Sequence, residues 1–166
     1  IQPILGSLFL YLFLRHHHLH PLSCALGSLS WALGGFFMAW LEWGNIGHTL
    51  LWLPLCLLLI NKYLTSQKKI YLFLNTLALS FSFFAGHLQL FFYIFLTTTA
   101  YFTWKTLLSK TALKEILSLA ISYVLLAAVI APQLLSTLQL IRLSAREIDQ
   151  IHIFVRPDWF LPWQHL

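Results

Sequence analysis

The sequence predicts an all-α protein, a polytopic bundle of transmembrane helices. Of its 166 residues, 59% are hydrophobic and only 9% are charged, and the mean hydropathy is +0.77. A soluble domain carries about 25% charged residues and a disordered chain has low hydrophobicity, so the composition excludes both classes. The net charge of +5 comes from short loops and not from a basic face interleaved with aromatic residues. We therefore expect membrane lipid, and no nucleic acid, as the partner.

Apolar runs separated by polar clusters indicate five or six spans, because a span needs roughly 17 to 25 apolar residues and a helix satisfies its own backbone in lipid. The first run is short, like the tail of a truncated span. The third contains Pro54, so we expect a kinked, protein-packed or re-entrant segment. Gly86 divides a stretch too long for one crossing, which predicts a tight helical hairpin. The runs cover residues 3–14, 21–41, 46–60, 70–85, 88–104 and 116–131.

The pattern changes after Pro132. Leu134, Leu138, Ile141 and Ala145 recur at helical spacing with polar residues on another side, which indicates an amphipathic helix outside the membrane or in its interface. We therefore divide the chain into a transmembrane region, 1–131, and a region of amphipathic helix and truncated extracytoplasmic loop, 132–166. The start at Ile1 without a methionine, and the end in mid-pattern, indicate an internal fragment of a larger membrane protein.

Lysine and arginine predict the orientation, because they accumulate on the cytoplasmic side of a membrane. The loops at 15–20, 61–69 and 105–115 hold seven of them, against Glu115 as the sole acid. We expect these loops to be cytoplasmic in a multi-pass plasma-membrane protein. The alternation is consistent across every predicted crossing.

This orientation brings three polar clusters to the outer face. They lie at 42–48, at 86–89 and at 132–147. A polar residue that faces the interior of a helix bundle is costly and usually serves a pathway or a site. The candidate substrate- or phosphate-binding residues are Glu42, His48, His87, Gln89, Gln133, Arg142, Ser144 and Arg146.

Each candidate has a structural alternative. Glu42 either lines an outward cavity or lies in the interface beside tryptophans. His87 either serves a phosphate or proton transfer, or caps the preceding helix. Arg142 and Arg146, four apart, either form a fork for a phosphate or belong to a solvated face in which Arg146 pairs with Asp149.

Metal chemistry has little support in the sequence. His16, His17, His18 and His20 are too close along one short turn for tetrahedral coordination, so we expect an interfacial turn. No cofactor is evident, and a divalent metal has no supporting motif. Phosphate-binding glycine loops, zinc-site spacings and nucleophile elbows do not occur. The two cysteines lie in apolar runs, where a thiol behaves as a small hydrophobe.

Short motifs occur in order along most of the chain. They are Gly86-His87-Leu88-Gln89, Ala131-Pro132-Gln133-Leu134-Leu135, Ser144-Ala145-Arg146 and Leu161-Pro162-Trp163-Gln164, with Glu42-Trp43 and Trp52-Leu53-Pro54-Leu55 before them. In this order and rough spacing the chain resembles the YfhO-type bacterial membrane proteins. That family is grouped with the multi-spanning GT-C glycosyltransferases.

The resemblance implies a protein of the bacterial plasma membrane that transfers a sugar, as a hexosyltransferase, from a polyprenyl-phosphate donor to a cell-envelope glycopolymer on the outer face. The acid that serves as catalytic base in GT-C enzymes would lie upstream of Ile1, so no catalytic residue is assigned. The motif positions are carried over without a role. Two alternatives stay open: a transporter or lipid-linked sugar flippase with Glu42, His48 and His87 along its pathway, and a non-catalytic membrane scaffold.

Overall fold

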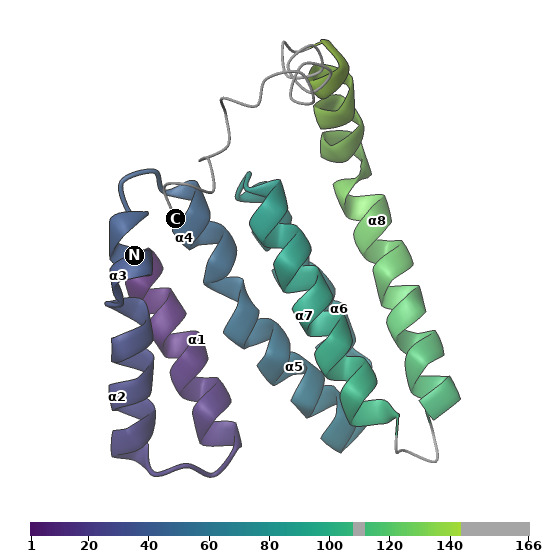
Figure 1. The fold of residues 1–166 in the computed structure, drawn as a ribbon. Helices are drawn as coiled ribbons and strands as arrows, with labels where there is room; N and C mark the ends of the chain where they lie inside the picture. Colours follow the sequence, from purple (N-terminus) through teal and green to yellow (C-terminus); the bar gives the residue numbers. More distant parts are fainter. Residues whose placement is uncertain (108–111, 144–166) are drawn as a thin grey trace, which may run out of the picture. The chain divides into compact units, whose positions relative to one another are not determined.

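The described residues form helices and turns, as the predicted all-α class requires. The computed structural model describes residues 1–107 and 112–143, with side chains for 1–107 and 112–140 (Figure 1). No strand occurs in these ranges. The chain divides into two compact units, Ile1–Ile130 and Ala131–Leu166. The helices are α1 (Gln2–His16), α2 (Pro21–Ala32), α3 (Gly35–Ala39), α4 (Asn45–Leu50), α5 (Trp52–Ser66), α6 (Ile70–Phe84), α7 (Leu88–Thr106) and α8 (Ala112–Leu143).

Three helical stretches of the described chain are long and apolar enough to cross a membrane. They are Pro21–Ala39, Asn45–Ser66 and Ala112–Leu140. The helix α6 is apolar but shorter than these stretches. The coarse prediction of a membrane protein built from helices therefore agrees with the fold.

Two predicted runs are interrupted where their sequences disfavour a continuous helix. Gly34 adopts an extended conformation between α2 and α3, so the run predicted at 21–41 is broken. The run predicted at 46–60 is split between α4 and α5 at Leu51, three residues before Pro54. Proline is tolerated in the first turn of α5, where its missing N–H has no helical partner. The break predicted at Gly86 is confirmed, since φ there is +90° between α6 and α7.

The helix that covers the run predicted at 116–131 extends beyond both ends of that run. The helix α8 continues through Pro132 to Leu143. Proline is tolerated inside apolar helices when side chains and neighbouring groups satisfy the freed backbone. In the next turn the Ser136 hydroxyl donates to the Pro132 carbonyl at 2.9 Å, and the Thr137 hydroxyl donates to the Gln133 carbonyl at 2.7 Å. Neither bond replaces the N–H that Pro132 lacks, whose helical acceptor would be the Ala128 carbonyl. The segment after Pro132 thus begins as a continuation of α8 and not as a separate helix.

The unit Ile1–Ile130 places its connections at two ends of a set of antiparallel helices. At one end lie the α1–α2 turn, the α5–α6 turn, the last turn of α7 and the first turn of α8 (Figure 1). At the other end lie the α3–α4 turn and the α6–α7 turn. We call the first the basic end. Its described basic residues are Arg15, Lys62, Lys68, Lys69, Lys105 and Lys114.

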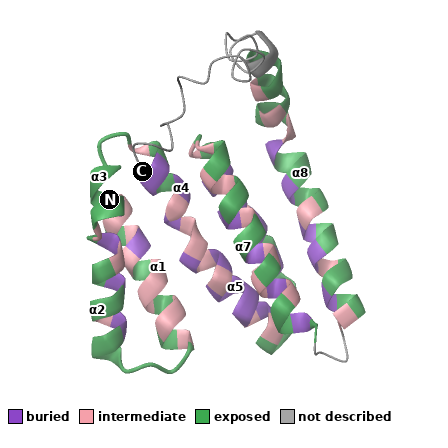
Figure 2. Cartoon of the chain, viewed as in Figure 1, coloured by how far each residue is buried: buried purple, intermediate pink, exposed green. Residues whose placement is uncertain are grey.

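Large apolar side chains cover much of the surface. Leu22, Leu113 and Val124 are 62%, 82% and 69% exposed. Polar residues meanwhile occupy the interior: Asn75 and Thr98 are fully buried. Figure 2 shows many exposed residues on α2, α7 and α8, whereas α5 is mostly buried or intermediate. Exposed apolar side chains suit a molecule whose solvent is lipid.

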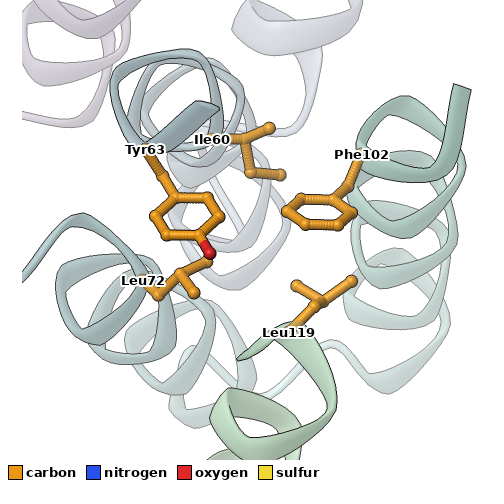
Figure 3. Packing of buried hydrophobic residues seen from close by; sticks show 5 residues of the cluster. All are labelled: Ile60, Tyr63, Leu72, Phe102 and Leu119. Carbon is orange, nitrogen blue, oxygen red and sulfur yellow. The ribbon is translucent and has the colours of Figure 1, made fainter. Parts of the chain in front are cut away.

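The core lies where four helices of this unit meet. The cluster contains Ile60 and Tyr63 of α5, Leu72 of α6, Phe102 of α7 and Leu119 of α8 (Figure 3). The rings of Tyr63 and Phe102 stack with centroids 6.2 Å apart and planes 18° apart. The two cysteines are buried and unpaired, as predicted.

Candidate functional site

A shallow hollow of about 210 Å³ lies at the end opposite the basic end. Its lining comes from two separate turns: His87 from the α6–α7 turn, and Trp40, Trp43, Asn45 and Ile46 from the turn before α4 and its first residues. The fold thus joins the first two polar clusters that the sequence predicted on one face. Two indoles, of which that of Trp43 is 71% exposed, line the hollow together with an amide and an imidazole. Ligand sites combine aromatic side chains with a few polar groups in this way.

His87 is held by its own helix. It is the N-cap of α7, and its Nδ1 accepts the Leu90 N–H at 3.2 Å. A backbone N–H only donates, so Nδ1 carries no proton and the neutral ring carries it on Nε2. His87 therefore caps the following helix, α7. The alternative that it caps the preceding helix is wrong. His87 is half-buried, and its capping bond leaves Nε2–H as the donor for a ligand.

Gln2, which we did not single out from the sequence, holds the turn before α4 that forms the second wall of the hollow. Gln2 of α1 donates from Nε2 to the Gly44 carbonyl at 2.7 Å, across 42 residues of sequence. Gly44 has φ +70°, a conformation that glycine adopts without strain. Since Gly44 precedes Asn45 directly, this bond fixes the turn that supplies the indoles.

Most other predicted site residues are not gathered at the hollow. Glu42 lies exposed in the turn after α3, outside the lining. His48 is exposed on α4 with its ring 6.4 Å from that of Trp52. Gln89 donates to the Tyr93 hydroxyl at 3.0 Å within α7. Of the predicted binding residues in unit Ile1–Ile130, His87 alone lines the hollow.

The remaining candidates belong to the second unit. Gln133 is exposed on α8, and its carbonyl accepts the Thr137 hydroxyl. Arg142 lies in the last turn of α8, but its side chain is outside the described residues. Ser144 and Arg146 are outside them as well. The predicted arginine fork for a phosphate therefore stays a prediction.

Sequence analysis also missed a set of buried polar side chains between the helices. Asn61 joins three helices: its Nδ2 lies 3.3 Å from His17 Nε2, and its Oδ1 accepts the Tyr101 hydroxyl at 3.0 Å. The Thr76 hydroxyl is 3.3 Å from the Ser122 carbonyl. Asn75 is fully buried with neither amide atom hydrogen-bonded among the described residues. Asparagine within an apolar run was the signal that could have found this set.

We predict that Tyr101→Phe, which deletes the hydroxyl bound to Asn61, lowers the free energy of unfolding by about 1 kcal/mol, because hydrogen bonds between membrane helices contribute that much. Unfolding in mixed micelles, followed by circular dichroism, measures the effect. The matched control is Tyr93→Phe, since that hydroxyl bonds only within α7. Equal losses in the two variants would contradict an interhelical role for Asn61.

The histidines near the basic end have local structural roles. His20 caps α2 by accepting the Leu22 N–H at 3.3 Å on Nδ1, and His17 contacts Asn61. Partial burial, then the nearby His17, Lys62 and His18, lower the pKa of His16, which favours its neutral form. Within the part of the chain that the structure describes, no three metal-binding side chains come together.

Comparison with known proteins adds no relative. No family model, no curated protein and no solved structure matches the chain.

Proposed function

We propose that this chain is the multi-spanning part of a YfhO-like, GT-C-type glycosyltransferase of the bacterial plasma membrane, and that the hollow binds the sugar of a polyprenyl-phosphate donor. The observation that carries the proposal is the lining of the hollow. Trp40 and Trp43 supply indole faces, and Asn45 and His87 supply polar groups beside them. Sugars present C–H faces to aromatic rings and hydroxyls to polar groups, so this lining matches their chemistry.

The orientation supports the same proposal. The basic end has six described lysines and arginines, whereas the hollow is at the opposite end of the unit. By the positive-inside rule the basic end faces the cytoplasm and the hollow faces outward. We propose five or six membrane crossings. The three long apolar stretches supply three of them, and α1, α6 and α7 supply the others. Outward is the side on which an envelope glycopolymer would accept the sugar.

We assign the residues of the hollow to binding. Among the described residues no carboxylate lines it, and the Nδ1 atom of His87, which could otherwise act as a base, is occupied by the Leu90 N–H. The hollow positions the donor sugar, with the His87 Nε2–H donating to a hydroxyl.

Binding of a short-chain polyprenyl-phosphate hexose to the full-length protein in nanodiscs tests the proposal. We expect Trp43→Ala to weaken the affinity about ten-fold, because stacking on an aromatic ring contributes on the order of 1 to 3 kcal/mol. We expect a similar loss for His87→Asn, which retains a good N-cap residue but lacks the ring Nε2–H.

The matched control for the first variant is Trp104→Ala, an exposed tryptophan near the basic end. Unchanged affinity in Trp43→Ala and His87→Asn, or an equal loss in Trp104→Ala, would remove the hollow from sugar binding. Circular dichroism on each variant separates loss of binding from loss of fold.

A second candidate function is transport of a substrate or flipping of a lipid-linked sugar. It is favoured by Asn75, whose buried amide has no hydrogen-bond partner among the described residues, since polar groups inside a helix bundle often mark a pathway. Substrate movement across proteoliposomes without formation of a glycosidic bond would favour this function over transfer.

A further inference from the structure

A groove between α6 and α8 lies near the basic end. It has a volume of about 190 Å³, and its walls are Leu72 and Phe73 of α6 with Ile121 and Leu125 of α8. At its depth the Thr76 hydroxyl of α6 lies 3.3 Å from the Ser122 carbonyl of α8. The two helices are thus joined at the back of the groove, and its front is open to the surrounding lipid.

One end of the groove is polar and the other is apolar. Lys69, exposed at the start of α6, and Ser118, half-buried on α8, lie at the end nearer the loops. From Ser118 the apolar wall follows α8 to Leu125, a rise of about 10 Å at 1.5 Å per residue. Phe73 and Ile121 are 51% and 56% exposed along it. The groove therefore begins beside a positive group near the loops and continues as an apolar channel along α8.

Among the described residues, no carboxylate forms an ion pair with Lys69, although the buried Glu115 lies three residues before Ser118 on α8. Lys68 precedes it, and Lys114 lies one helical turn from Ser118, whose hydroxyl donates to the Lys114 carbonyl at 2.9 Å. The nearby acid, Glu115, is buried and accepts a hydrogen bond from Gln67 at 3.2 Å. The mouth of the groove therefore suits an anion.

We propose that this groove binds an anionic glycerophospholipid of the cytoplasmic leaflet. The phosphate lies against the Lys69 ammonium, which offers a compact charge and three donors. One acyl chain follows Leu72, Phe73, Ile121 and Leu125 into the bilayer. Basic pockets between transmembrane helices on the cytoplasmic side are suited to such headgroups. This inference rests on the proposed orientation of the basic end but not on the sugar hollow, which lies at the other end of the unit.

The test uses full-length protein in phosphatidylcholine nanodiscs that contain a trace of one photoactivatable lipid. The probe is phosphatidylglycerol or phosphatidylcholine with a diazirine in its acyl chain, and mass spectrometry locates the labelled residues. We expect labels around residues 72–73 and 121–125, with a yield about five-fold higher for phosphatidylglycerol. One lysine beside an anionic lipid contributes about 1 kcal/mol, which corresponds to that ratio.

Three variants make the test specific. We expect Lys69→Gln to abolish the preference for phosphatidylglycerol. The matched control, Lys105→Gln, removes a lysine near the same end that lies 5.1 Å above the Trp104 ring and does not line the groove, so we expect the preference to persist. Ile121→Trp fills the channel but keeps Lys69, and we expect lower labelling by both probes.

Equal labelling by the two probes in the unmodified protein would overturn the proposal, because the groove would then accept any acyl chain. An equal effect of Lys69→Gln and Lys105→Gln would overturn it too, since the preference would then arise from the general charge of the basic end. Labels outside the groove would place the lipid elsewhere. If Lys69→Gln fails to fold by circular dichroism, Ile121→Trp decides: undiminished labelling would contradict the site.

Discussion

Replacing Phe102 with alanine is expected to lower the free energy of unfolding of the helix bundle by about 2 kcal/mol. Phe102 is fully buried, and it stacks on Tyr63 in the cluster where α5, α6, α7 and α8 meet (Figure 3). In a water-soluble core the same change costs about 3 to 5 kcal/mol, which includes the transfer of the side chain from water. In a bilayer the separated helices are solvated by lipid, so mainly the packing and cavity contribution is lost.

Unfolding in mixed micelles, followed by circular dichroism, measures this loss. The matched control is Trp104→Ala on the same helix, because Trp104 is 64% exposed and its removal opens no cavity. We expect that variant to stay within about 0.5 kcal/mol of the unmodified protein. A Phe102→Ala protein as stable as the control would contradict the assignment of the core to this cluster.

Replacing Gly6 with leucine is expected to destabilise the packing of α1 against α2 by about 2 kcal/mol, the usual cost of inserting side-chain atoms into a filled contact. A Cβ atom at Gly6 would lie 2.7 Å from Cζ3 of the Trp31 ring and 3.6 Å from Cβ of Leu51. The absence of a side chain thus allows the helices to approach closely, as small residues do in membrane bundles.

Gly35→Leu is the matched control, since a Cβ there meets nothing within 4 Å. Both variants lose a helical glycine, so a difference in unfolding free energy between them isolates the contact with Trp31. A shift in Trp31 fluorescence in Gly6→Leu would locate the disturbance. Equal stabilities would show that the Trp31 ring moves aside without cost.

The candidate site could be predicted only in part. His87 was identified from its place in a turn between two apolar runs, and its neighbours in the 42–48 cluster were expected on the same face. The sequence did not indicate which residues would line the hollow together with His87. Glu42 and Gln89 carry more suggestive chemistry than Trp40, yet Trp40 lines the hollow and they do not.

Composition and spacing were enough to predict a helical protein, helices apolar enough for lipid, and several of the breaks between helices. These properties follow from local composition: an apolar run in lipid has to form a helix, and glycine at residue 86 or proline at residue 54 interrupts it. The continuation of α8 past Pro132 was missed, because the penalty for a proline depends on which groups satisfy the backbone around it.

The residues that meet across the bundle became known from the fold, because they are far apart in the sequence. Gln2 and Gly44 are 42 positions apart, and Asn61 and Tyr101 are 40 apart. In lipid, burying an apolar face brings no general driving force for helices to associate, so contacts such as these depend on side-chain shape and on individual hydrogen bonds. Neither leaves a periodic pattern along the chain, which is why composition and spacing predicted the helices but not the hollow, the polar interior or the groove between α6 and α8.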